Sequence, residues 1–264
     1  MPLAILYREE LKEYDFGAGH PFRGARYEKF YRFLKENLSD EFYLFHSADN
    51  RPIGRPGKLE EAARLIVGQA KRAVDLVEGG EFEKASSIGG GMHHAKSGFG
   101  EGFCIFVYQI GEGEGKGDTI NVPMPIGASY DSYKSVFVEI IEPVVKEFEP
   151  ELIVRYGGSD PYLNDQLTQL GLPIKGFRMI GEKTREIAEI CQGKEIDLIA
   201  SGYNEDVLPY AWLALISGLA GLKIAVKERE PIAERYRRDL ASKDTEKVVR
   251  EVKEELKDYW RCFG

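Results

Sequence analysis

The chain has 264 residues, of which 43% are hydrophobic and 11% aromatic, so it can bury a sizeable core as one large α/β domain. Its formal net charge of −8 argues against a protein that tracks nucleic-acid phosphates, because such a protein would carry a basic stripe. The charge favours a small or cationic substrate, and no apolar run approaches the length that a bilayer crossing needs.

Short apolar runs with β-forming residues alternate with helical patterns along the chain. The expected strands are residues 3–7, 42–45, 85–88, 103–108, 152–156, 197–200 and 223–226. The expected helices are residues 26–37, 59–77, 132–148, 175–190, 207–219 and 233–259. This alternation predicts an α/β fold, a three-layer αβα domain around a mainly parallel sheet with both faces covered.

The expected helices differ in how they should pack. The helix that begins near Leu59 places small and apolar residues on one face, as packing on a sheet requires: Ala62, Leu65, Ile66, Ala70, Ala73 and Val77. We expect residues 1–264 to form a single domain with a charged helical C-terminal segment from about residue 228. That segment either packs on the outside of the domain or forms a partner interface.

The cysteines and the N-terminus indicate the compartment. The three cysteines, Cys104, Cys191 and Cys262, are odd in number and widely spaced, so they form neither a disulfide framework nor a paired zinc ribbon. The N-terminal apolar run meets a charge at Arg8, too early for a signal peptide. We therefore expect a cytoplasmic protein with no membrane and no direct nucleic-acid partner.

Residues with catalytic chemistry follow the expected strands. His93 and His94 lie in a glycine-flanked loop after one strand, and Asp160 and Tyr203 follow two others. In open α/β sheets the active site lies beyond the carboxyl ends of the strands, so these four side chains should converge at one rim. Two imidazoles in one loop favour a proton-transfer site.

Five short segments, read together, are more specific than any one of them. They are Gly-Gly-Gly-Met-His-His-Ala-Lys at 89–96, Gly-Phe-Cys at 102–104, Gly-Ala-Gly-His-Pro-Phe-Arg at 17–23, Gly-Gly-Ser-Asp at 157–160 and Ser-Gly-Tyr at 201–203. In their order along the chain they resemble the zinc-dependent histone deacetylase family, which includes acetylpolyamine amidohydrolases and acetoin-utilisation proteins. The resemblance runs from about residue 6 to about residue 221 and implies an arginase/deacetylase-like fold.

The resemblance implies a role for each catalytic residue. His93 and His94 would be the general base and acid, and Tyr203 would donate its phenol to the oxyanion. Asp160 would be one ligand of a zinc ion. Zinc would be the cofactor, since it lowers the pKa of a bound water from near 15.7 to roughly 7.

The resemblance also implies the substrate-binding residues. Gly102 and Phe103 would line a narrow channel for an acyl-lysine side chain, because an aromatic wall suits an apolar stem. His20 and Arg26 match the N-terminal loop, where the arginine helps to line a polar pocket that could hold acetate. The substrate would be an acetyl-lysine, an acetylated polyamine or another small acylated amine.

The chain departs from the family pattern at the metal site. The family holds zinc with two aspartates and one histidine, two of which arrive as Asp-x-His after Gly-Phe-Cys. The only histidines here are His20, His46, His93 and His94, and none follows an aspartate by two. The stretch without a counterpart is at least a βαβ unit, roughly 30 residues. We therefore expect the sheet to lack at least one strand–helix unit.

Two functions follow from these observations, and the sequence leaves both open. The first is a zinc-dependent deacetylase, and the second is a metal-deficient, inactive relative that at most binds an acylated amine, since catalytic zinc normally takes three protein ligands. Acyl transfer through Cys104 is weaker, because no base is evident beside it. Loss of a strand should also expose apolar surface around residues 103–108, which a homo-oligomer would cover.

Overall fold

Five parallel strands form one sheet in the part of the chain that the structure describes. This computed structural model describes residues 3–39, 43–46, 58–89, 117–229, 231–233 and 238–264. The strands are β1 (Leu3–Leu6), β2 (Tyr43–His46), β3 (Lys84–Ile88), β4 (Ile153–Gly157) and β5 (Glu195–Ile199). Their order is β2-β1-β3-β5-β4, and every pair is parallel, so all carboxyl ends meet at one edge. The strand expected at 103–108 lies outside the described residues.

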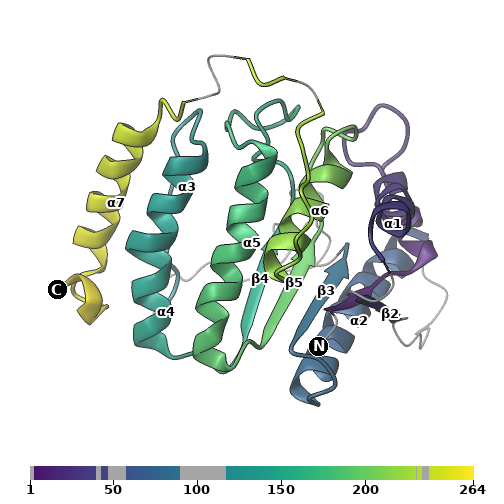
Figure 1. The fold of residues 1–264 in the computed structure, drawn as a ribbon, viewed down its shortest axis with the longest axis horizontal. Coiled ribbons are helices and arrows are strands. Elements are labelled where there is room, and N and C mark those ends of the chain that lie inside the picture. The colour runs from purple at the N-terminus through teal and green to yellow at the C-terminus, as the bar shows by residue number, and fades with distance from the viewer. Residues whose placement is uncertain (1–2, 40–42, 47–57, 90–116, 230, 234–237) are drawn as a thin grey trace.

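Helices cover both faces of this sheet (Figure 1). The α-helices are α1 (Ala25–Asn37), α2 (Lys58–Glu78), α3 (Tyr130–Val136), α4 (Glu142–Phe148), α5 (Ile174–Ala188), α6 (Leu208–Leu219) and α7 (Ser242–Leu256). Short helical turns are η1 (Glu9–Glu13), η3 (Phe137–Ile141), η4 (Glu189–Cys191) and η6 (Arg261–Phe263). None of the described helices has the length and apolar character that crossing a membrane requires.

The two faces of the sheet belong to different hydrophobic clusters. Ile5, Ile88 and Ile199 are fully buried in the cluster that contains the apolar residues of α1, α5 and α6. Leu6 and Ile196 point to the opposite face and pack against Ala73, Leu76 and Val77 of α2. The three-layer αβα architecture expected from the sequence is confirmed, and so is the apolar face of the helix that begins near Leu59.

A second group of helices extends the layer that covers one face. The helix α3 continues through a π-helical turn, η3, into α4, and Pro143 lies directly after that turn. Proline has no backbone N–H to donate, and a π turn is one way to accommodate the missing bond. In Figure 1, α3 and α4 lie beside α5, and α7 lies on the far side of α3 and α4, beyond β4, the last strand of the described sheet. Helical cover therefore extends past the described sheet edge.

Two expected elements differ from the structure, and side chains explain both. Residues 223–226 form no strand, because the guanidinium of Arg178 donates to the carbonyls of Leu222 and Ile224 at 2.9 and 2.8 Å. This side chain supplies donors that a neighbouring strand would supply in a ladder. The last helix begins at Ser242 and not at 233, since Asp239 accepts the backbone N–H groups of Ser129 and Ala241, which fixes a turn there.

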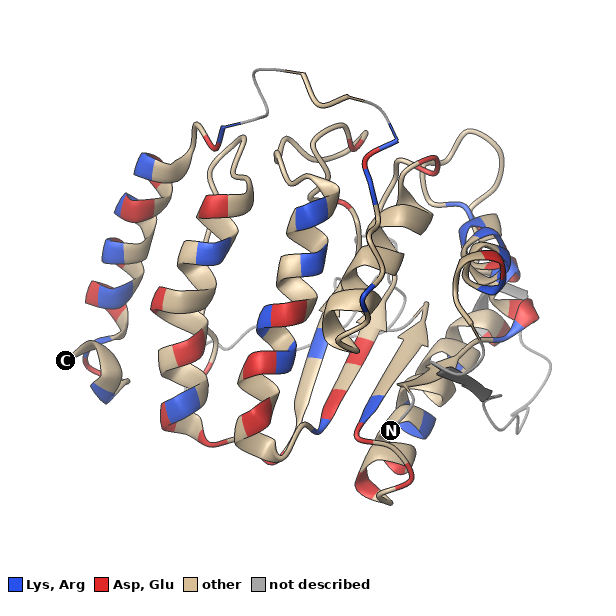
Figure 2. Ribbon diagram, in the orientation of Figure 1, with Lys and Arg blue, Asp and Glu red and all other residues tan. Residues whose placement is uncertain are grey.

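Four charged residues lie within the strands themselves, as Figure 2 shows for β3, β4 and β5. Arg155 on β4 pairs with the fully buried Asp197 on β5 at 2.5 Å. Lys84 on β3 pairs with the fully buried Glu195 on β5 at 3.4 Å and also donates to the carbonyl of Gly193. Burial raises the pKa of Glu195 to about 8, and the neighbouring Asp197 adds to this effect.

Because its pKa is higher in the folded state, Glu195 should make the protein less stable as pH rises. The stabilising contribution is complete below the ordinary pKa of 4.5 and is lost as pH rises through about 8. The loss is at most about 1.4 kcal/mol for each pH unit in this window. We expect Glu195→Gln to remove this dependence. The melting temperature of the variant, relative to that of the wild type, should therefore rise from pH 5 to about pH 8. Glu78→Gln, which changes an exposed carboxylate paired with Lys194, is the control; curves that stay parallel for wild type and Glu195→Gln contradict the prediction.

Candidate functional site

Asp160 and Tyr203 line one cavity of about 510 Å³. Asp160 lies in the loop after β4, and Tyr203 lies in the loop after β5. Gly158 and Ser201 line the same cavity from these two loops, and Phe22 lines it from the N-terminal loop. The structure thus brings together two of the four residues that were expected to converge at the carboxyl edge of the sheet.

The two loops approach each other so closely that only glycine fits at the contact. The backbone N–H of Ser159 donates to the carbonyl of Ser201 at 2.7 Å. A Cβ atom on Gly158 would overlap that same carbonyl, and one on Gly202 would overlap the hydroxyl of Ser159. Gly202 also has a φ of +130°, which residues with side chains rarely adopt. The glycines of both motifs are therefore needed to bring Asp160 and Tyr203 into one site.

The carboxylate of Asp160 faces polar and aromatic neighbours. The hydroxyl of Ser201 donates to its Oδ1, and the hydroxyl of Thr168 donates to its backbone carbonyl. Burial raises the pKa of Asp160, and the bond from Ser201 opposes this effect. Tyr133 of α3 lines the same cavity, and burial together with the charge of Asp160 raises its pKa. The carboxylate is thus a half-buried acceptor in the wall of a largely apolar cavity.

Asp165 fixes the turn that carries Tyr203. Its Oδ2 accepts the backbone N–H groups of Tyr203 at 2.7 Å and Asn204 at 3.3 Å. Its Oδ1 accepts the backbone N–H of Leu167 at 2.9 Å. One carboxylate therefore ties the loop of Asp160 to the loop of Tyr203. Three backbone bonds already engage this carboxylate, so it is poorly placed to bind a metal.

Arg26 holds the same turn from the other side. Its side chain is 1% exposed and donates to the carbonyls of Gly202 at 2.5 Å, Pro21 at 2.9 Å and Arg23 at 2.9 Å. The guanidinium lies over the ring of Phe22 at 4.2 Å and over the ring of Tyr203 at 5.3 Å. The three hydrogen bonds and the two ring contacts are all with the protein itself, and they orient the phenol of Tyr203.

His20 lies in the N-terminal loop, close to Phe22. Its Nδ1 accepts the backbone N–H of Phe22 at 3.1 Å, and its ring packs on Phe16 with a centroid distance of 4.8 Å. Of this loop, Phe22 lines the cavity and His20 does not. The contacts of His20 favour a role in shaping the loop.

Four of the expected site residues, His93, His94, Gly102 and Phe103, lie outside the described residues. The chain enters this part after Gly89, whose N–H donates to the carbonyl of Ile199 at 2.6 Å. Gly89 follows the carboxyl end of β3, at the same sheet edge as the loops of Asp160 and Tyr203. The histidine loop thus begins at the expected edge, and its roles remain predictions.

The donor set in the described residues does not fit a catalytic zinc ion. The described residues contain no group of three His, Cys, Asp or Glu side chains that could hold a metal. Asp160 is one carboxylate, Asp165 is engaged by backbone amides, and Nδ1 of His20 accepts a backbone N–H. Catalytic zinc normally takes three protein ligands.

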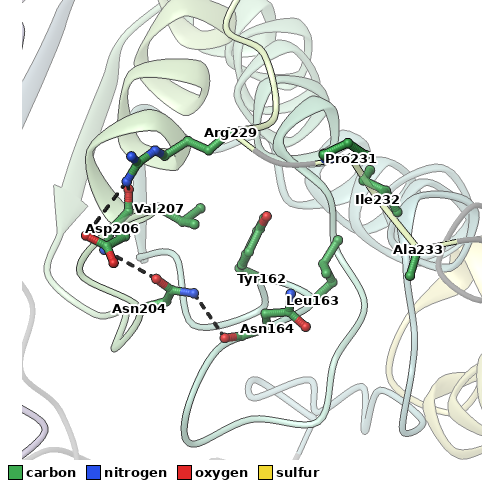
Figure 3. A pocket seen from close by; sticks show the side chains of 10 residues that line it. All are labelled: Tyr162, Leu163, Asn164, Asn204, Asp206, Val207, Arg229, Pro231, Ile232 and Ala233. Carbon is green, nitrogen blue, oxygen red and sulfur yellow. Dashed lines mark hydrogen bonds and ion pairs between the residues drawn. The ribbon is translucent and has the colours of Figure 1, made fainter.

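A second cavity, of about 430 Å³, is lined by Asn204, Asp206 and Val207 of the segment after Tyr203, together with residues near Tyr162 and Arg229 (Figure 3). Asn204 donates to the carbonyl of Asn164 at 3.1 Å and accepts the N–H of Asp206. Arg229 donates to the carbonyl of Asp206 at 3.3 Å and so joins the segment after α6 to this turn. Of the expected site residues that the structure describes, none lines this cavity, and its contacts serve to hold the turn.

The structure places three residues at the site whose roles were not predicted from the sequence: Asp165, Ser201 and Tyr133. Ser201 belongs to the Ser-Gly-Tyr motif, and Asp165 is a nearby carboxylate that matches no ligand of the family; an aspartate that accepts the N–H two residues ahead is a common turn former. Tyr133 lies on α3, far from both motifs in the sequence, and no local pattern marks it. Long-range packing alone brings Tyr133 to Asp160.

The α/β fold brings the loops of Asp160 and Tyr203 to one edge of the sheet, and comparison with known proteins gives the family. The model of the histone deacetylase domain matches residues 25–108 and 106–219. These residues make up more than half of the chain, which therefore belongs to the histone deacetylase domain family.

Curated relatives share part of their length with this chain. A probable deacetylase of Archaeoglobus fulgidus is 35% identical over 161 residues, 59% of this chain and 45% of the relative. A histone deacetylase-like amidohydrolase of Pseudomonas aeruginosa is 33% identical over 120 residues, 45% of this chain and 32% of the relative. The chain thus spans less than half the length of these two relatives. The acetoin utilization protein AcuC of Staphylococcus xylosus is 24% identical over 315 residues, with 82% of each chain covered.

A solved structure of the histone deacetylase Clr3 matches the fold with a TM-score of 0.71 at 16% identity. The match covers 100% of this chain and 58% of the Clr3 chain. This similarity confirms the arginase/deacetylase-like fold expected from the sequence.

Proposed function

We propose that this protein binds a small acylated amine at the Asp160–Tyr203 site and, as a single chain, hydrolyses it poorly at most. The observation that carries this proposal is the shared cavity of these two residues, in which a phenol and a carboxylate meet apolar walls. A phenol can donate to the carbonyl of an amide, and the carboxylate can accept from an amide N–H. The walls suit the apolar stem of an acylated lysine or polyamine.

The proposal of poor hydrolysis rests on the metal ligands. The sequence has no Asp-x-His, and the described residues contribute one carboxylate to the place where the resemblance puts a zinc ion. Without three ligands, zinc should bind weakly and supply little activated water. The alternative is an active zinc-dependent deacetylase, which the family membership favours.

We further propose that the chain lacks an internal unit that its relatives carry. The two segments that match the family model meet at residues 106–108, where the resemblance expects the missing stretch. The similarity to AcuC extends over 315 residues, whereas this chain has 264 residues and only 82% of them take part. AcuC therefore has residues without a counterpart here. Both observations support an internal loss between Gly-Phe-Cys and α3.

Binding can be tested separately from hydrolysis. We expect N-acetyl-lysine amide to bind the full chain, and Tyr203→Phe to weaken binding about fivefold, because one hydrogen bond contributes about 1 kcal/mol. Calorimetry measures this affinity, and product analysis of the same samples measures turnover. Tyr259→Phe removes a hydroxyl from a tyrosine that is 48% exposed and serves as the control.

The outcomes separate the two functions. The proposal is supported if Tyr203→Phe weakens binding, Tyr259→Phe leaves binding unchanged and little product forms. Equal affinity in wild type and Tyr203→Phe removes the tyrosine from the site. Rapid hydrolysis that depends on added zinc favours the active deacetylase.

A further inference from the structure

We propose that the cavity beside β4 accommodates a neutral aliphatic chain, so that the acylated amine carries an acyl group longer than acetyl. This inference rests on the proposed function, because it names the substrate class of the same site. The cavity extends from Asp160 and Tyr203 along β4, where Arg155, Tyr156 and Gly157 also line it. An acyl group held at the first two residues would therefore direct its tail along the strand.

The position of the cavity follows from the fold. In the described residues, β4 pairs with β5 alone and forms the edge of the sheet. Helices α3, η3 and α4 continue past this edge (Figure 1), and residues of α3 and η3 line the cavity. The space thus lies between the last described strand and helices that have no described strand beneath them.

The walls of the cavity are mostly apolar. They include side chains from the segment before α3, from α3 and η3, and from α5: Val122, Met124, Val136, Phe137, Ile141 and Ile180. Apolar cavities stay dry and take up apolar ligands. One water molecule takes roughly 30 Å³ in the liquid, and an acetyl group is only a few times larger. The cavity volume of about 510 Å³ therefore far exceeds that of an acetyl group.

The charge in the cavity argues for a neutral tail. Arg155 lines the cavity, and its guanidinium pairs with Asp197 at 2.5 Å, so the two charges offset each other. An anionic tail would compete with Asp197 for Arg155 and leave a fully buried carboxylate without its partner. A cationic tail along β4 would bring a like charge close to Arg155. A hydrocarbon tail disturbs neither charge.

Affinity as a function of chain length tests the proposal. We expect the affinities of N-acetyl-, N-butyryl- and N-octanoyl-lysine amide for the full chain to rise by up to about fourfold for each added methylene, until the cavity is filled. Calorimetry measures binding, and product analysis confirms that each ligand stays intact during the titration.

Paired substitutions locate the tail. Val122→Phe and Ile141→Phe fill the cavity from two different elements, and each should remove the gain with chain length while leaving the affinity for the acetyl compound within about threefold. Ile126→Phe, in the same segment as Val122 and 77% exposed, and Val138→Phe, on η3 and 43% exposed, are the matched controls. Two filling variants keep the test decisive if one fails to fold.

The failure of this inference differs from the failure of the proposed function. Acetyl and octanoyl compounds that bind with equal affinity overturn the aliphatic pocket and leave binding of an acylated amine intact. A gain with chain length that persists in both filling variants also overturns it. If chain-length-dependent binding occurs together with rapid hydrolysis, the pocket stands and the proposed lack of activity fails.

Discussion

Gly158→Ala should destabilise the protein by about 3 kcal/mol and abolish binding of the acylated amine. A Cβ atom at this position would overlap the backbone carbonyl of Ser201, and backbone cannot move aside as a flexible side chain can. The loops after β4 and β5 would have to separate, which would also break the bond between the N–H of Ser159 and the carbonyl of Ser201. Chemical denaturation measures the free energy of unfolding, and calorimetry measures binding.

Gly80→Ala is the matched control for this change. Gly80 has a φ of +73° and nothing within 4 Å of a Cβ atom, so alanine there meets backbone strain without a clash. Its cost should be about 1 kcal/mol, with binding unchanged. Equal losses in the two variants would show that the close approach at Gly158 contributes nothing beyond glycine's backbone freedom.

Asp165→Ala should have the second largest effect, on both binding and stability. The substitution removes the acceptor of three backbone N–H groups, those of Leu167, Tyr203 and Asn204. Partly buried donors without partners cost about 1 kcal/mol or more each, so we expect a loss of about 2–3 kcal/mol. Tyr203 would lose its fixed position, and affinity for the acylated amine should fall at least as far as in Tyr203→Phe.

Two variants separate the positioning role of Asp165 from general stability. Asp165→Asn keeps one carbonyl oxygen and should recover part of the affinity, since the strongest bond, to the N–H of Tyr203, can form again. Asp206→Ala removes an 81% exposed carboxylate from the loop that carries Tyr203, and it should change neither the affinity nor the stability by much. An Asp165→Ala protein that is destabilised and yet binds normally would contradict the role proposed for this aspartate.

The sequence predicted the fold well where local pattern and packing agree. The apolar face of α2 and the strands β3, β4 and β5 were each placed within about two residues, because their apolar residues both favour the element and fill the core. Residues 223–226 alternate like a strand and yet form none. There the side chain of Arg178 satisfies the carbonyls, and such a contact between distant residues leaves no local pattern.

The candidate site could be predicted in part, for a similar reason. Asp160 and Tyr203 were found because parallel strands end at one edge of the sheet, which places the loops that follow them side by side. The cavity along β4 was not foreseen, because it depends on helices α3 and η3 that extend past the last described strand. The roles of His93, His94, Gly102 and Phe103 stay predictions, since these residues lie outside the described residues.

The zinc content of the purified full chain tests the central claim most directly, namely that this member of the deacetylase family lacks a complete metal site. The protein would be incubated with excess zinc and dialysed against metal-free buffer, and its metal would then be measured by mass spectrometry alongside Asp160→Ala. We expect well under one zinc ion per chain in both proteins, since one carboxylate holds zinc weakly. One zinc ion per chain that survives dialysis in the wild type and is lost in Asp160→Ala would contradict the claim.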